Sequence, residues 1–132
     1  MELAEIGKNI LTNCMNVKPG ENVLIVTDDE KYAIGQTLYQ AAKLLKAEAM
    51  LMTMTAREVS GQEPPAVVAA AMKAADVVIC PMKTSITHTR AKIEAAKAGA
   101  RIATMPGITE EMFAKGAMTA DYSRVIDRKS VV

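Results

Sequence analysis

Two kinds of hydrophobic pattern alternate along the chain. Apolar residues at intervals of three or four positions predict helices, whereas short continuous or alternating apolar runs predict strands. The strand-like runs span 22–27, 49–55, 77–80 and 101–105. Runs with helical spacing span 3–14, 34–45, 67–75 and 91–98, and a last helix is expected to begin at Thr109.

This alternation predicts the fold class. Strands joined by crossover helices pair in parallel and are covered by helices on both faces. We therefore expect an α/β fold, a Rossmann-like or flavodoxin-like three-layer sandwich with a mainly parallel sheet of about four strands. Residues 1–118 are expected to form this domain. Residues 119–132 carry no closing helix or strand signal, so we expect them to form a connection toward a further region of chain.

Composition narrows the classes of function. Half of the 132 residues are apolar, which is enough for a core without disulfides or metals. The net charge of +1 provides no basic field for nucleic acid or for an anionic membrane. The few aromatic side chains do not supply a stacking platform for single-stranded nucleic acid. No apolar run approaches the roughly 20 residues that span a bilayer, and the N-terminus has no signal-like segment. We expect a soluble, cytoplasmic protein with no nucleic-acid or membrane partner.

Residues that could bind a metal are scattered. Cys14 and Cys80 lie far apart and belong to no Cys-x-x-Cys pair, so we expect two reduced thiols, with a disulfide between them as the alternative. His88 is the single histidine, whereas a catalytic zinc site usually takes three protein ligands. The alternating methionines of 50–54 are interpreted as adaptable core residues and not as a soft-metal site. The sequence predicts no metal and no cofactor in this chain.

Two adjacent carboxylates follow the first strand. Asp28 and Asp29 resemble the acidic pair that holds magnesium in phospho-receiver domains, but the third strand ends in Cys80 and Pro81 and offers no aspartate to accept a phosphoryl group. The simpler interpretation is that one aspartate caps the following helix. Both remain candidates for ligand binding. The same segment lacks a glycine-rich loop, so no dinucleotide cofactor is expected.

The segment after the third strand is the best local candidate for a ligand site. Its candidate residues are Lys83, Thr84, Ser85, Thr87 and His88. Hydroxyls, backbone N–H groups and a cation at the start of a helix suit a small carboxylate or phosphate. Ser85 or Thr87 is expected to cap this helix, with His88 in its first turn, where the helix dipole disfavours the imidazolium. The alternative is a purely structural role in helix capping.

Several stretches form an ordered set. They are NCMNVKPGENVLIVTD at 13–28, GQEPP at 61–65, AADVVIC at 74–80, SITHT at 85–89 and GARIATMPGIT at 99–109, the last followed by EMF at 111–113. Together they resemble the thermophilic-type metallo-aminopeptidases, the leucyl aminopeptidase-like group of aminopeptidases T and S. The resemblance extends over residues 8–122.

The resemblance implies the N-terminal α/β domain of an enzyme that removes N-terminal amino acids from peptides. In that family a C-terminal region holds two divalent metals, zinc or cobalt. This chain ends before those ligands, so no catalytic or metal-binding residue is carried over, and we expect the chain alone to be inactive. The implied partners are the C-terminal catalytic region, the peptide substrate and a second subunit, because family members form dimers. The alternative function is a stand-alone domain for small-anion binding or assembly.

Overall fold

The computed structural model describes residues 3–59, 61–109 and 111–113. Its elements, in chain order, are α1 (Leu3–Asn9), the π-helical turn η1 (Ile10–Cys14), β1 (Asn22–Asp28), α2 (Tyr32–Leu44), β2 (Glu48–Met54), α3 (Ala66–Ala74), β3 (Val77–Met82), α4 (Arg90–Lys97) and β4 (Arg101–Pro106). The strands and helices predicted up to residue 106 are therefore all found, with boundaries shifted by a few residues.

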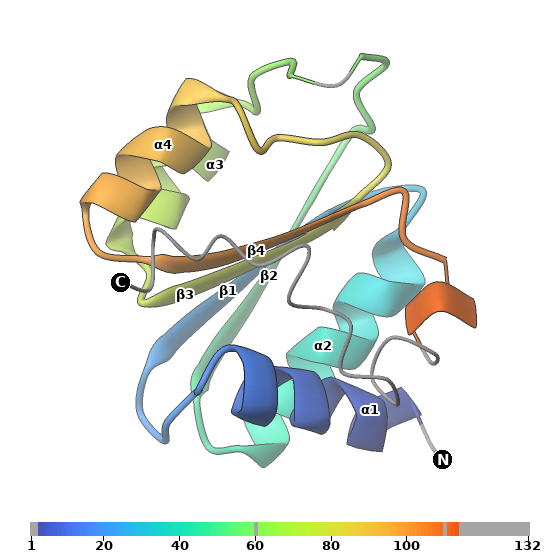
Figure 1. Cartoon of the computed structure of the whole chain (residues 1–132), viewed down its shortest axis with the longest axis vertical. Coiled ribbons are helices and arrows are strands. Elements are labelled where there is room, and N and C mark those ends of the chain that lie inside the picture. The colour runs from blue at the N-terminus through green and yellow to red at the C-terminus, as the bar shows by residue number, and fades with distance from the viewer. Residues whose placement is uncertain (1–2, 60, 110, 114–132) are drawn as a thin grey trace.

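The strands form one parallel sheet in the order β2-β1-β3-β4. The helices α1 and α2 cover one face and α3 and α4 cover the other, which gives three layers (Figure 1). The α/β prediction is confirmed, and this strand order is that of the flavodoxin-like sandwiches. The order places β1 and β3 in the middle of the sheet, where both faces are buried.

Each face of the sheet has its own hydrophobic core. Along β1, Val23 and Ile25 pack with the helices α1 and α2, whereas Leu24 and Val26 pack with α3 and α4. Side chains alternate between the faces of a strand, so a strand buried on both faces needs apolar residues at successive positions. This explains why the β1 and β3 sequences are continuous apolar runs.

Glycine allows α2 to approach the sheet closely. A Cβ on Gly35 would lie 2.8 Å from both the Cβ and the Cγ2 of Thr27, a separation that real carbon atoms do not adopt. Thr27 is fully buried at the end of β1. Gly35 is therefore required for this contact between helix and strand, although glycine is a poor residue for the interior of a helix.

Several expectations concern the C-terminal part of the chain. Thr109 Oγ1 accepts a hydrogen bond of 3.1 Å from Met112 N–H, and residues 111–113 are helical, as predicted for a helix that starts at Thr109. The expected boundary between residues 118 and 119 lies outside the described residues. Within the described ranges, no helix is both long enough and apolar enough to cross a membrane.

Candidate functional site

The sheet has a topological switch point between β1 and β3. From β1 the chain proceeds to β2 at one edge, and it then crosses to β3 on the other side of β1. Ligands of open parallel sheets bind outside the carboxyl ends of the strands at such a point. Asp28 ends β1 and Lys83 follows β3, so the topology brings these two predicted site residues together.

The carboxylate of Asp28 closes the gap between the two strand ends. The side chain is fully buried. Its Oδ1 accepts hydrogen bonds from the N–H groups of Glu30 and Lys31, at 3.0 and 2.9 Å, and its Oδ2 accepts one from Lys83 N–H at 2.7 Å. Asp28 thus orders the turn before α2, and it also fastens β1 to the loop after β3. These three contacts, all with backbone N–H groups, serve the fold. The expectation that an aspartate caps α2 is wrong, because the N-cap residue is Lys31 and no side chain caps this helix.

Asp29 points to a different partner. Its Oδ1 accepts a hydrogen bond from Ala56 N–H at 3.1 Å, and its own N–H donates to the carbonyl of Met54 at 3.1 Å. The two carboxylates therefore diverge, one toward β3 and the other toward β2. In the described part of the chain, no three or more His, Cys, Asp and Glu side chains gather in a group that could hold a metal ion.

Lys83 lies above the switch point within an acidic environment. Its Nζ is 3.3 Å from Glu30 Oε2, and its side chain is about one-third exposed, at 37%. The hydrogen bond to Glu30 and then the charges of Glu30 and Glu58 raise the pKa of Lys83 above its ordinary value. The ammonium group is therefore held in the charged form, but carboxylates of the protein already surround it. An added anion would compete with them.

The hydroxyl groups of the β3–α4 loop bind to one another. Ser85 Oγ donates to Thr87 Oγ1 at 2.9 Å and accepts from Thr87 N–H at 3.1 Å. Thr87 Oγ1 lies 3.0 Å from Thr104 Oγ1 on β4. Thr84 is half-buried in the same loop. This chain of hydroxyls orders the loop against the sheet.

The N-terminus of α4 differs from the sequence prediction. Thr89 caps the helix, because its Oγ1 accepts from Lys92 N–H at 3.2 Å, whereas Ser85 or Thr87 was expected to do so. His88 is exposed and precedes the helix, so the expectation that it lies in the first turn is wrong. The reason is that Ser85 and Thr87 form a turn of their own, which delays the start of α4.

Glu63 was missed by the sequence analysis. Its carboxylate reaches across from the β2–α3 loop and accepts hydrogen bonds from Arg90 N–H at 2.6 Å and Ala91 N–H at 3.2 Å. Gly61 N–H also donates to the carbonyl of Ser85 at 2.9 Å, so the two loops lie side by side (Figure 1). An acidic side chain of the protein thus occupies the place where a bound anion was expected. The only feature of the sequence that pointed to Glu63 was its position in the GQEPP stretch at 61–65.

Both cysteines are reduced and form no disulfide with each other, so the disulfide alternative is wrong. Cys80 is fully buried in β3, and burial raises the pKa of its thiol from 9.0 to about 12, with a smaller opposing effect from the charge of Lys92. A thiol with so high a pKa is not a nucleophile at neutral pH. Cys80 is a core residue of the sheet.

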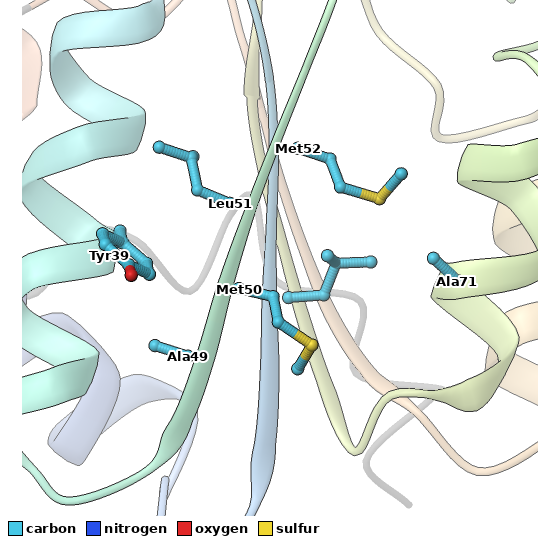
Figure 2. Close-up of a pocket in the computed structure, with 7 residues that line it drawn as sticks. Tyr39, Ala49, Met50, Leu51, Met52 and Ala71 are labelled. Atoms are coloured by element: carbon cyan, nitrogen blue, oxygen red, sulfur yellow. The ribbon is translucent and has the colours of Figure 1, made fainter.

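The edge strand β2 carries an apolar hollow of about 620 Å³. Figure 2 shows the strand edge-on, with Ala49 and Leu51 turned toward Tyr39 of α2 and the methionines Met50 and Met52 turned toward Ala71 of α3. The prediction that the alternating methionines fill the core is confirmed for Met54, which is 8% exposed. It is wrong for Met50, which is 41% exposed. Met54 packs in the core with α3 and α4, whereas Met50 lines the hollow further along the same strand, a difference that spacing does not reveal.

Comparison with known proteins identifies a structural likeness. Among solved structures, the chain is similar to 2,5-dihydroxypyridine dioxygenase from Pseudomonas putida KT2440, with a TM-score of 0.64 and 18% sequence identity. The similar region covers 79% of this chain and 33% of that one, so this chain corresponds to about a third of the larger protein. At this identity the likeness shows the fold alone. No protein-family model and no curated protein sequence matches the chain.

Proposed function

We propose that this chain is the α/β domain of a metal-dependent aminopeptidase that removes N-terminal amino acids from peptides. The observation that carries the proposal is the ordered set of family-like stretches. These stretches include β1 with its preceding turn, part of the β2–α3 loop, most of β3, part of the β3–α4 loop and β4. Of these, β1 and β3 flank the switch point.

The proposal assigns a structural role to this domain. In the described residues, the donor groups do not fit a pair of zinc or cobalt ions, so we assign no step of the reaction to them. The proposed partners are the C-terminal catalytic region of the same enzyme, which supplies the metal site, the peptide substrate and a second subunit. The proposed location is the cytoplasm. Without the catalytic region, this chain is inactive.

The size and activity of the native polypeptide test this function. An antibody against the domain is used to size and capture the polypeptide from an extract of the source cells. We expect a band well above 14.1 kDa. The captured material should release leucine from a chromogenic leucine amide when zinc or cobalt is supplied, and a chelator should abolish the release. A native band of 14.1 kDa, or a longer polypeptide inactive with either metal, would contradict the proposal.

The purified chain provides the matched control for that experiment. It should release no leucine from the same amide with either metal. Metal-dependent release by the chain alone would mean that its own residues hold the reacting groups, and the structural role would then be wrong.

The second candidate is a stand-alone domain for small-anion binding or assembly. The bond between Glu63 and α4 weighs against its anion-binding half, because the N–H groups of Arg90 and Ala91 are already satisfied. The exposed edge of β2 favours its assembly half. Thermal unfolding in the presence of phosphate or acetate distinguishes anion binding from assembly. A rise in Tm that disappears in the variants Lys83→Ala and Ser85→Ala would support anion binding, and no rise would exclude it.

A further inference from the structure

Arg57 has a buried donor whose hydrogen no described residue accepts. The residue lies in the loop that follows β2, and its side chain is half-buried. Its Nε atom is buried and has no hydrogen-bond partner in the described part of the chain. A buried donor without an acceptor destabilises a protein, and more so on a charged group, which is why such groups are rare in native structures. The guanidinium of Arg57 therefore requires an acceptor from elsewhere.

The position of Arg57 favours a ligand as that acceptor. The N–H group of the preceding residue, Ala56, donates to Asp29 Oδ1 at 3.1 Å, which fastens the backbone beside Arg57 to the end of β1. Since β1 is the neighbour of β2 in the sheet, the Arg57 side chain starts from the carboxyl edge, next to the switch point between β1 and β3. Ligands of open parallel sheets bind outside this edge. A donor left over at this edge, unlike one inside the core, can be reached by a bound molecule.

Lys83 provides a comparison at the same edge of the sheet. Its Nζ lies 3.3 Å from Glu30 Oε2. The hydrogen bond to Glu30, followed by the charges of Glu30 and Glu58, raises the pKa of Lys83. The protein thus supplies carboxylates to Lys83, whereas no described carboxylate forms an ion pair with Arg57. Of these two cations, Arg57 is the one whose donors remain for a ligand.

The chemistry of the guanidinium indicates the class of ligand. Nε and one terminal nitrogen present two parallel N–H groups, which match the two oxygens of a carboxylate. Phosphate also accepts such a pair, but at neutral pH it carries more than one negative charge. Asp29, Glu30 and Glu58 bring negative charges of the protein to the same loops, and these oppose a doubly charged ligand more strongly than a singly charged one.

We propose that Arg57 binds the carboxylate of a small organic acid at the carboxyl edge of the sheet, with Nε and a terminal nitrogen donating to its two oxygens. This site is separate from the candidate anion site at Ser85 and Thr87. It uses residues of this chain alone and is independent of the proposed peptidase activity.

Titration of the whole chain with N-acetylglycine, without added metal, tests the site. Proton–nitrogen NMR follows the side-chain Nε–H signal of Arg57 and the backbone N–H signals of Ala56 and Glu58. We expect these signals to shift and to saturate, with a dissociation constant of about 1 mM. N-acetylglycinamide has nearly the same shape but no charge, and it should bind at least about tenfold more weakly.

Two arginine variants test the geometry of the site. Arg57→Lys keeps the charge but loses the paired donors, so it should raise the dissociation constant by about tenfold, as followed by the signals of Ala56 and Glu58. Arg90→Lys is the matched control, because it makes the same change at an exposed arginine, and it should leave binding unchanged. Ser85→Ala should also bind as the wild type does.

Four results would overturn the proposal. They are the absence of any saturable shift, equal binding of the acid and its amide, tighter binding of phosphate than of N-acetylglycine, and equal dissociation constants for Arg57→Lys and Arg90→Lys. Loss of binding in Ser85→Ala would place the anion in the β3–α4 loop instead. Because no metal is added and no leucine is released in this titration, its failure is distinguishable from failure of the proposed function.

Discussion

The buried carboxylate of Asp28 accepts a hydrogen bond of 2.7 Å from the backbone N–H of Lys83, 55 residues away in the chain. The same side chain accepts from the N–H groups of Glu30 and Lys31. One residue therefore joins the end of β1, the turn before α2 and the loop after β3.

Replacement of Asp28 by alanine should destabilise the protein substantially. Asp28→Ala leaves three backbone N–H groups without their acceptor, and unsatisfied polar groups away from water are costly. We expect the free energy of unfolding to fall by about 3 kcal/mol, measured by urea denaturation followed by circular dichroism. Asp29→Ala is the matched control, because Asp29 is exposed and accepts one bond; it should cost about 1 kcal/mol or less. Equal losses in the two variants would contradict this account.

Gly35→Ala should destabilise the protein although alanine is the better helix former. The added methyl group would lie 2.8 Å from Thr27 Cβ, and the β-branched Thr27 cannot rotate away while its hydroxyl bonds the carbonyl of Pro81. Overpacking of this kind costs about 1–3 kcal/mol, more than the gain of about 1 kcal/mol in helix propensity. The control is Gln36→Ala, at the next position of α2 and exposed, which should be neutral in the same urea titration. A stabilised Gly35→Ala variant would mean that α2 can move off the sheet.

Glu63→Gln should weaken the start of α4. The carboxylate of Glu63 lies at the positive end of the helix and accepts two of its first N–H groups. The amide keeps one acceptor oxygen but loses the charge, so we expect a loss of about 0.5–1 kcal/mol that decreases as salt screens the wild-type charge. Glu94→Gln, within the same helix, should change stability little. If the two variants have equal Tm values, the bond of Glu63 to α4 has no energetic weight.

The buried thiol of Cys80 should make stability depend on alkaline pH. Its pKa is about 12 in the folded chain, against 9.0 for an ordinary thiol, so the folded state retains a proton that the unfolded state loses. The retained proton stabilises the folded state fully below pH 9.0. This contribution to the free energy of unfolding is lost as the pH rises from 9.0 toward 12, by up to about 1.4 kcal/mol per pH unit. Urea titrations between pH 8 and pH 11 should show a steeper decline for the wild type than for Cys80→Ala. Parallel declines would show that this thiol does not titrate differently in the two states.

Alkylation tests the same burial directly. In a Cys14→Ser variant, the remaining thiol should resist iodoacetamide while the chain is folded and react once urea unfolds it, as detected by mass spectrometry. Cys80→Ala leaves Cys14, which is half-buried, and should react more readily in the folded state. Rapid labelling of folded Cys14→Ser would contradict the placement of Cys80 in the core.

Hydrophobic pattern alone was sufficient to predict the elements and the fold class. A run such as that of residues 22–27 must be covered on both faces, and alternation with helices makes the strands parallel. Local chemistry also pointed to an aspartate that organises the chain after β1, but Asp28 accepts from the N–H groups of the turn and does not cap α2. These features depend on residues close together in the chain, and a sequence displays such residues directly.

Tertiary structure decided which residues meet and which strands lie at the edges of the described sheet. The bond of Asp28 to Lys83 crosses 55 positions, and that of Glu63 to Arg90 crosses 27. The periodicity of apolar residues predicts neither of these contacts between distant parts of the chain. Ser85 and Thr87 were candidates for an anion site, and the structure shows that their hydroxyls bind each other while Glu63 accepts from the first N–H groups of α4. Met50 and Met54 share one face of β2, yet Met54 packs in the core with α3 and α4 whereas Met50 lines the hollow at the strand edge. Burial and long-range hydrogen bonding arise from strand order, which the folded chain alone establishes.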